Sequence, residues 1–246
     1  MKNVFSLSCL LVNIILFAQV SSGKIVYKNL VSKQEKATLF FDRNSSLFLL
    51  QNDKNEETKI IKMSDGSIVY PSNTIDSIAN RTKFIYFDNK KKTFYNNVIN
   101  NDIEVVLFDI SKVKWKITDE KKEILMYSCQ KAEGEYYGKR YTAWFTRELP
   151  YNYGPLKING LNGIILEVST NENSFHLIAE NLINSDFSNE IQSFTSKYDF
   201  NKSISREDYK KILDSQLKEF EDNININLPE TKKIKLKKDC LDCNEK

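Results

Sequence analysis

Histidine, glycine, proline and cysteine are all scarce in this chain of 246 residues. His176 is the one histidine, so any catalytic pairing of a serine or cysteine with histidine has to involve it. Seven glycines and four prolines form no flexible linker, which favours a single folded domain. The motifs Gly-x-Ser-x-Gly and His-Glu-x-x-His are absent, and no glycine-rich phosphate loop follows a predicted strand. These absences argue against the common hydrolase and nucleotide-binding classes.

Neither sign of charge dominates the chain. It carries 36 basic and 33 acidic residues, a formal net charge of +3, and its aromatic residues are not interleaved with arginine. This balance argues against nucleic-acid binding. The few cysteines and the single histidine do not form the four-ligand pattern of a zinc site. We therefore expect no metal and no cofactor.

The N-terminus has the pattern of a secretory signal peptide. Residues 1–3 are short and positive, residues 4–17 are almost wholly apolar, and Ala18 or Ser22 offers a small residue before a cleavage point. The apolar run is shorter than the roughly 20 residues of a membrane-spanning helix. We predict that residues 1–18 are removed, that no transmembrane segment remains, and that the protein is exported to the periplasm or the cell exterior.

Short β-favouring runs follow this segment. They lie at residues 23–27, 37–41, 46–51, 82–88, 104–109 and 174–180, separated by polar clusters. At 113–117, Val113, Trp115 and Ile117 alternate with two lysines, as in a strand with one buried face. We place Trp115 in the core, with ligand stacking as its functional alternative. The spacing predicts a mainly β (α+β) fold, either a curved antiparallel sheet or a partly open barrel.

One amphipathic helix is predicted near the C-terminus. Ser205 is suited to cap it, and Asp208 lies three residues later, as in a capping box. Apolar residues then recur at helical spacing, namely Tyr209, Ile212, Leu213, Leu217, Phe220 and Ile224. We expect this helix to pack its apolar face on the sheet. Residues 19–228 would then form one antiparallel-β domain.

Glycine and proline, rare elsewhere, gather between residues 129 and 168. Five of the seven glycines and two of the four prolines lie there. Residues 125–132 and 138–146 are predicted to pair as a hairpin, with a connection at 132–138, and residues 164–168 are predicted to form a further strand. Residues 147–163 combine prolines that restrict φ with glycines that permit positive φ. We predict an irregular connection there, held against the rest of the protein.

The same region resembles a known bacterial family. The resemblance is carried by residues 129–132 and 140–146 and by a set of single positions: Arg140, Trp144, Pro150, Gly154, Pro155, Gly160, Leu161, Asn162, Gly163, Ile164 and Ile165. In these residues the chain is similar to the GLPGLI proteins, although Asn162 replaces the proline of that motif and Ile164 replaces its leucine. The resemblance implies a secreted bacterial protein and a structural role for the motif, and it implies no particular reaction.

The C-terminal tail, residues 229–246, is rich in lysine and ends in a Cys-x-x-Cys pair. Export to an oxidising compartment makes disulfides possible. Cys129 is predicted to pair with Cys240 or Cys243, with a Cys240–Cys243 ring and a buried, inert Cys129 as the alternative. A thioredoxin-like role is not expected, because the pair has no helix after it.

Three functions are compatible with these features. In the first, the curved sheet resembles the fold of periplasmic lipoprotein carriers and binds a lipid or other apolar ligand without catalysis, with Trp115 and Trp144 as candidate ligand residues. In the second, residues 147–163 recognise another envelope protein through Arg147, Tyr151 and Tyr153. A hydrolase is the third and least favoured, and would use paired carboxylates among Glu133, Glu135, Glu148 and Glu167.

Overall fold

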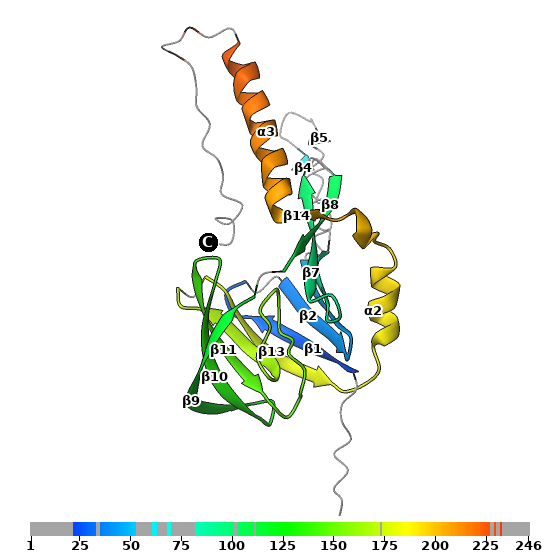
Figure 1. The fold of residues 1–246 in the computed structure, drawn as a ribbon, viewed down its shortest axis with the longest axis vertical. Helices are drawn as coiled ribbons and strands as arrows, with labels where there is room; N and C mark the ends of the chain where they lie inside the picture. The colour runs from blue at the N-terminus through cyan, green and yellow to red at the C-terminus, as the bar shows by residue number, and fades with distance from the viewer. Residues whose placement is uncertain are drawn as a thin grey trace, which may run out of the picture.

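The computed structural model describes residues 22–32, 35–52, 61–62, 68–69, 82–100, 103–110, 112–172 and 174–226, with residues 229 and 232. Within these residues, twelve strands form one large sheet and two short strands form a separate hairpin (Figure 1). The strands of the large sheet are β1 (Ser22–Asn29), β2 (Glu35–Asp42), β3 (Ser45–Asn52), β6 (Lys83–Asp88), β7 (Thr93–Asn100), β8 (Ile103–Asp109), β9 (Lys114–Ile124), β10 (Tyr127–Tyr136), β11 (Lys139–Thr146), β12 (Ile164–Thr170), β13 (His176–Ile183) and β14 (Ile204–Ser205). The separate hairpin pairs β4 (Ile61–Lys62) with β5 (Ile68–Val69).

The strand order of the large sheet is β14-β8-β7-β6-β3-β2-β1-β13-β12-β11-β10-β9. Two antiparallel meanders, β1-β2-β3-β6-β7-β8 and β9-β10-β11-β12-β13, join where β1 pairs with β13. Only β14 runs parallel to its neighbour, β8, among the described strands. The end strands β14 and β9 do not pair with each other, so the sheet is open. This arrangement confirms the mainly β fold with an open, curved sheet, while the likeness to lipoprotein carriers stays a prediction.

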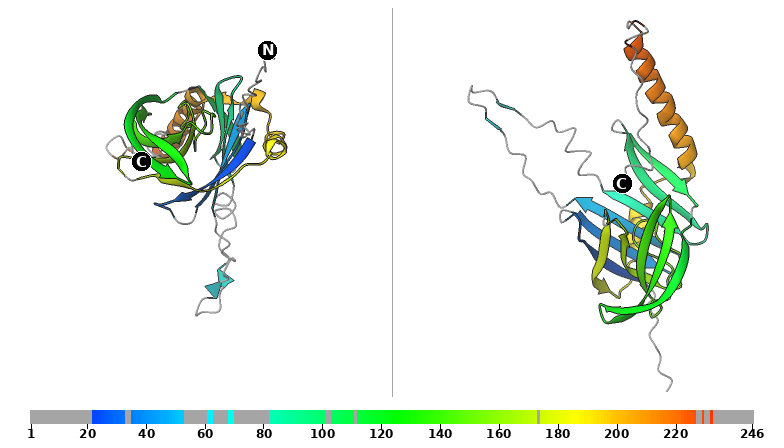
Figure 2. Two further views of the ribbon diagram at one scale, coloured as in Figure 1. Left: turned by 90° about the horizontal axis from the view of Figure 1, so that it is seen from below. Right: turned by 90° about the vertical axis from the view of Figure 1, so that its left-hand side faces the viewer.

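Register irregularities help to curl the sheet. They lie between Val26 and Tyr27, between Gln130 and Ala132, and beside Trp144. A bulge adds residues to one strand of a pair, which bends that strand and increases its twist. β9–β11 and β6–β8 curve toward each other from opposite sides of the central strands (Figure 2). The two meanders therefore face each other across a concave space.

The predicted central hairpin is confirmed, but its turn is shorter than expected. β10 continues to Tyr136, and the turn has positive φ at Tyr137 (47°) and Gly138 (76°). Two residues with positive φ give the turn whose twist matches that of paired strands. Gly134 lies inside β10, where an added Cβ would come within 2.7 Å of the Trp115 ring. This glycine therefore serves close packing and not the turn.

The C-terminal helix α3 (Arg206–Asn225) forms as predicted, but only its first turn packs against the sheet, beside β8 and β14. The Ser205 hydroxyl accepts a hydrogen bond from the amide of Asp208, which caps the helix. Only Tyr209 of this helix is buried. From there α3 extends away from the sheet (Figure 1), and Phe220 remains 59% exposed. Beyond this first turn, the apolar face of the helix lacks the sheet contact that its pattern predicted.

Several elements were not anticipated from the sequence. Besides the two-residue strands β4, β5 and β14, they are β7, the helix α2 (Ser188–Thr195) and the short 3-10 helix η1 (Phe200–Lys202). α2 packs against the outer side of the first meander, where Phe194 meets Phe84 with ring centres 5.3 Å apart. Leu47, Phe84 and Ile191 form a small buried cluster under this helix. The larger core lies between the two meanders and contains most of the other buried apolar residues.

Some predictions fall on residues outside the described part of the chain. The signal peptide at 1–18 and the Cys-x-x-Cys pair at the C-terminus are two of them. Among the described residues, no helix has both the length and the apolar character needed to cross a membrane.

Candidate functional site

An apolar cavity of about 410 Å³ lies between the two meanders. Its apolar walls come from β3, β6, β7 and β8 on one side and from the 156–158 segment and Phe175 on the other, through Leu50, Ile85, Val98, Leu107, Leu156 and Ile158. Tyr136 and Tyr141 of β10 and β11, and Tyr209 of α3, add aromatic rings with polar ends. The cavity is therefore assembled from segments that are far apart in the sequence.

Asp109 holds the two meanders together beside this cavity. The residue ends β8 and is 6% exposed. Its Oδ2 accepts hydrogen bonds from the hydroxyls of Tyr136 and Tyr137 at the end of β10, each at 3.1 Å. The Lys157 ammonium lies 3.1 Å from the same oxygen. A carboxylate removed from water needs such donors and a cation, so this contact ties β8, β10 and the 147–163 connection to one another.

Within the described part of the chain, the charged residues that line the cavity are all cationic. They are Lys139 at the start of β11, Lys157, and Arg206 at the start of α3. The Arg206 guanidinium lies 4.5 Å from the centre of the Tyr137 ring, which is a cation–π contact. The Lys139 side chain is half-buried and has no hydrogen bond or ion pair with another described residue. The cavity thus combines apolar walls with positive charge.

Uncharged polar side chains also belong to the lining, and Asn96 is the one with an unsatisfied atom among the described residues. Asn96 lines the cavity, and its Oδ1 is buried without a hydrogen-bond partner among the described residues. Its Nδ2 donates to the carbonyl of Asn97 at 3.3 Å. A buried acceptor without a donor costs free energy, so a water molecule or a ligand hydroxyl would be favourable there.

Residues 147–163 form the predicted irregular connection, and their middle part closes one side of the cavity. An added Cβ at Gly163, whose φ is +156°, would lie 2.0 Å from the carbonyl oxygen of Thr146. At Gly154 it would lie 2.3 Å from the carbonyl oxygen of Ile158. Both glycines therefore permit backbone contacts that any side chain would prevent. The connection is held against the protein, as predicted.

The three anchors predicted in this connection differ in exposure. Arg147 is exposed, Tyr151 is half-buried and stacks near Tyr153, and Tyr153 is only 1% exposed. The Tyr153 hydroxyl donates to the carbonyl of Arg43 at 3.3 Å, and burial raises the pKa of Tyr153 well above its usual value. Arg147 is thus the one exposed member of this trio, and its guanidinium lies 5.9 Å from the centre of the Phe145 ring. Their role in recognition stays a prediction.

The two tryptophans lie outside the cavity lining. Trp115 is partly buried against the core, and its Nε1 donates to the carbonyl of Asn159 at 2.8 Å. This bond ties β9 to the 147–163 connection. Trp144 of β11 is covered by the Lys122 ammonium, 4.3 Å from its ring centre. None of the five residues predicted to contact a ligand or partner lines the cavity.

The other positions of the glycine-containing motif serve packing. Leu161, Ile164 and Ile165 are 2% exposed or less. Gly160 has a φ of +93°, which favours glycine. Asn162, Arg140 and Pro150 are exposed, whereas Pro155 is buried. The motif therefore fastens the connection to the start of β12.

His176 forms part of a polar group on β12 and β13. Its Nε2 lies 3.1 Å from Glu167 Oε1, and the other carboxylate oxygen of Glu167 pairs with the Lys122 ammonium. Cys129 lies opposite Lys122 in the pairing of β9 and β10, and burial raises the pKa of its thiol to about 11. A thiol that stays protonated at neutral pH lacks the thiolate that nucleophilic catalysis needs.

The predicted disulfide finds no support in the structure. Cys129 is a free, fully buried thiol. No other cysteine is among the described residues. Cys240 and Cys243 lie outside those residues, so the pairing of the tail cysteines stays a prediction. Among the described residues, no group of three or more acidic, cysteine or histidine side chains is placed to hold a metal.

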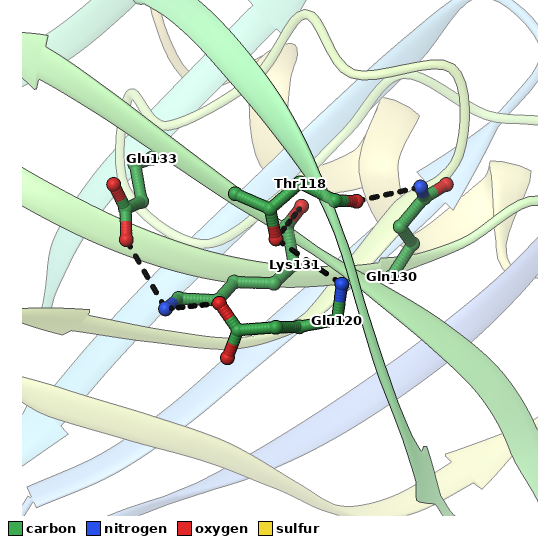
Figure 3. Close-up of polar contacts among 5 residues, drawn as sticks. All are labelled: Thr118, Glu120, Gln130, Lys131 and Glu133. Atoms are coloured by element: carbon green, nitrogen blue, oxygen red, sulfur yellow. Dashed lines mark hydrogen bonds and ion pairs between the residues drawn. The ribbon is translucent and has the colours of Figure 1, made fainter.

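A second polar group lies on the β9–β10 pair (Figure 3). The Lys131 ammonium contacts Glu120 at 2.8 Å and Glu133 at 3.1 Å, and hydrogen bonds to both raise its pKa. The Gln130 amide donates to the carbonyl of Thr118 at 2.7 Å. These contacts cover the register irregularity in β10, next to the sheet's end strand. Bulges and charges on an end strand discourage pairing with another chain, which explains this group without a ligand.

The four carboxylates considered for hydrolysis do not share one partner. Glu133 pairs with Lys131, Glu148 accepts a hydrogen bond from the amide of Ser128, and Glu167 pairs with His176. Glu135 is exposed at the end of β10. Glu133, Glu148 and Glu167 therefore each stabilise a different pair of strands or a turn.

A comparison with models of protein families identifies the family of this chain. The model for the N-glycanase peptide, N-terminal domain, matches residues 33–209. The chain belongs to this family. The matched region includes the second meander, the first meander except β1, the cavity segments and the first turn of α3, whereas the rest of α3 lies beyond it. A comparison with curated protein sequences gave no significant match.

Solved structures share the fold of this chain. One structure of PNGF-II, in space group C2, has a TM-score of 0.52 and 19% sequence identity over 77% of this chain and 32% of that chain. Another, in space group P21, has a TM-score of 0.53 and 18% identity over 78% of this chain and 32% of that chain. The chain thus spans about a third of the length of these structures. At such identities the likeness establishes a common fold and no common activity.

The resemblance to the GLPGLI proteins is wrong, since the matching family is that of the N-glycanase N-terminal domain. The motif was a misleading indicator of family because its glycines are required by local backbone packing in this chain. Gly163 removes the side chain that would collide with Thr146, and Gly160 adopts positive φ. A connection that approaches a strand this closely requires such residues in any family.

Proposed function

We propose that this chain is an exported, non-catalytic module that binds an apolar ligand in the cavity between the two meanders. The cavity is the observation that carries the proposal. It offers about 410 Å³ and is closed by strands of both meanders, by the 156–158 segment and by the first turn of α3. Mostly apolar walls with a few converging polar groups are the usual character of a small-molecule site.

Family membership supports a binding role. The matching family is described as an N-terminal domain of an N-glycanase, and the chain covers only 32% of the PNGF-II structures that it resembles. The buried Cys129 thiol and the paired Glu167 carboxylate also lack the arrangement of an activated nucleophile or a poised acid–base pair. Support for export comes from the signal-peptide pattern at residues 1–18.

Binding of a neutral apolar dye tests this proposal. N-phenyl-1-naphthylamine fluoresces strongly in apolar sites, and we expect saturable binding with one site per chain. Val98→Trp fills the cavity from β7 and should weaken dye binding at least tenfold, because the site loses its free volume. Ile103→Trp places the same ring at a position of β8 that is 65% exposed, and should leave binding unchanged. Circular dichroism checks that both variants fold.

The proposal fails if a folded Val98→Trp variant binds the dye as tightly as the original protein. It also fails if the original protein shows no saturable binding. The alternative of protein recognition through residues 147–163 ranks second, because two of its three predicted anchors are partly or fully buried. Arg147→Ala should leave dye binding unchanged under either function, so the dye experiment reports on the cavity alone.

A further inference from the structure

The charge of the cavity narrows the class of its ligand. Lys139, Lys157 and Arg206 line it, and no carboxylate is among the described residues of its lining. Asp109 lies close by and offsets the charge of Lys157, with Nζ and Oδ2 3.1 Å apart. Lys139 adds a further positive charge beyond that pair. A partly apolar space with an excess of positive charge favours an anionic group.

Lys139 is the most informative of these cations. Its side chain is half-buried where β11 begins, and its ammonium has no hydrogen bond or ion pair with another described residue. Partial burial of a charge without a counter-ion costs free energy, because the surrounding water that would solvate it is reduced. An anion bound beside Lys139 would recover that free energy and would form a charge-assisted hydrogen bond.

The remainder of the cavity suits a hydrocarbon chain. Leu50 and Ile85 come from the centre of the first meander, Val98 and Leu107 from its end, and Ile158 from the connection that closes the site. Apolar surface of this kind is favourably covered by methylene groups. The cationic residues come from the other meander, the closing connection and α3, so polar and apolar parts of the lining arise from different segments.

We propose that the ligand is a single-chain amphiphile with an anionic head group, a carboxylate or a phosphate, whose head contacts Lys139. Its hydrocarbon chain lies among the apolar side chains of β3, β6, β7 and β8. This inference rests on the proposed function, since it specifies the ligand of the same cavity. It adds a requirement for negative charge that an apolar site alone does not have.

Isothermal titration of the folded protein with four twelve-carbon ligands, each below its micelle concentration, tests the head group. The ligands are dodecanoate, dodecyl phosphate, dodecanol and dodecyltrimethylammonium. We expect at least one anion to bind about tenfold or more tightly than dodecanol, and the cation to bind most weakly. Comparison of the two anions then distinguishes a fatty-acid head from a phosphate head.

Each outcome of this titration decides a different point. If the anionic, neutral and cationic ligands bind equally well, the cavity binds apolar ligands as proposed and the anionic preference is wrong. If none of the four binds, both proposals fail. Preference for the cationic ligand would also overturn the inference.

Variants at two lysines test the position of the head group. Lys139→Met keeps the length and apolar stem of the side chain and should weaken binding of the preferred anion about tenfold, while leaving dodecanol affinity unchanged. Lys210→Met on α3 removes an exposed charge that does not line the cavity, and should change neither affinity. Equal effects of the two variants on the anion would place the head group elsewhere. Arg206→Met then identifies whether the second lining cation provides the contact instead.

Discussion

The helix α2 has eight residues and begins without a side-chain cap, whereas α3 has twenty residues and begins at Ser205, whose hydroxyl caps it. The shorter helix nevertheless lies on the sheet, and the longer one extends from it (Figure 1). Ile191 of α2 is 4% exposed, whereas Ile212 of α3 is 44% exposed. Strong local helix signals and strong tertiary contacts therefore occur in different helices.

Aromatic packing explains the position of α2. Phe194 and the following Tyr198 both contact the Phe84 ring, with centre distances of 5.3 and 4.5 Å. Phe187, at the start of the helix, meets Phe40 of β2 with centres 5.5 Å apart. Such ring pairs add stability beyond the area that they bury. α2 therefore depends on strands that lie about 100 residues or more earlier in the chain.

Local interactions explain the formation of α3. Ser205 satisfies the amide of Asp208, and the Asp208 carboxylate accepts hydrogen bonds from the Ser205 hydroxyl and the Lys211 ammonium, each at 2.8 Å. Acidic residues in its first turn suit the positive end of the helix dipole. These contacts lie within one turn and do not require the sheet. Periodicity thus indicates that a helix forms, and it does not identify the surface that the helix contacts.

The largest expected difference between the helices concerns isoleucine truncation. Ile191→Ala removes a buried side chain between α2 and the sheet and should lower the free energy of unfolding by about 2–4 kcal/mol. Ile212→Ala removes a side chain exposed on α3 and should change the free energy of unfolding by less than about 0.5 kcal/mol. Urea unfolding followed by circular dichroism measures both. Equal losses would show that α3 has a stabilising contact comparable to that of α2.

A smaller effect is expected at the cap of α3. Ser205→Ala removes the hydroxyl that satisfies the Asp208 amide and should destabilise the helix by about 1 kcal/mol. Hydrogen exchange should then become faster in the first turns of α3 and remain unchanged in α2. Ser215→Ala, at an exposed position in the middle of the same helix, is the matched control and should not accelerate exchange. Faster exchange in α2 as well would contradict the independence of the two helices.

The two helices should also respond to opposite extremes of pH. Burial, with a smaller effect from Glu104, raises the pKa of Tyr198 to about 12, so the folded state favours the neutral phenol. That stabilisation is complete below the ordinary value near 10 and is lost as the pH rises through about 12. Hydrogen bonds from Lys211 and then Ser205 lower the pKa of Asp208 below 3.8. The stabilisation of α3 is therefore present above 3.8 and is lost as the pH falls through the lowered pKa.

Carbon-13 NMR of the Tyr198 ring and the Asp208 carboxyl measures these titrations directly. Tyr198→Phe should reduce the alkaline loss of stability, and Asp208→Asn should remove the acid response of the first turn of α3. An unshifted Tyr198 titration near pH 10 would show that the α2 contact does not favour the neutral ring.

Local patterns in the sequence determined most of the long strands, the capped helix and the glycine-dependent connection, whereas β7 was missed. Alternation at 113–117 predicted β9, the capping residues predicted the start of α3, and glycines at 160 and 163 predicted special backbone geometry. These features depend on residues within a few positions of one another, where sterics and hydrogen bonds act without the rest of the fold. The short helix α2 lacked such a signal and was missed.

Only the tertiary structure decided the cavity and the position of α3. Lys139, Lys157 and Arg206 come together because the sheet curls and Asp109 ties β8 to β10. No spacing in the sequence indicates that these three cations line one space, since their proximity depends on contacts between distant strands. The same reason explains why the predicted ligand residues lay elsewhere. Side-chain type and periodicity describe what a segment can bury, and the packing of distant segments determines what it contacts.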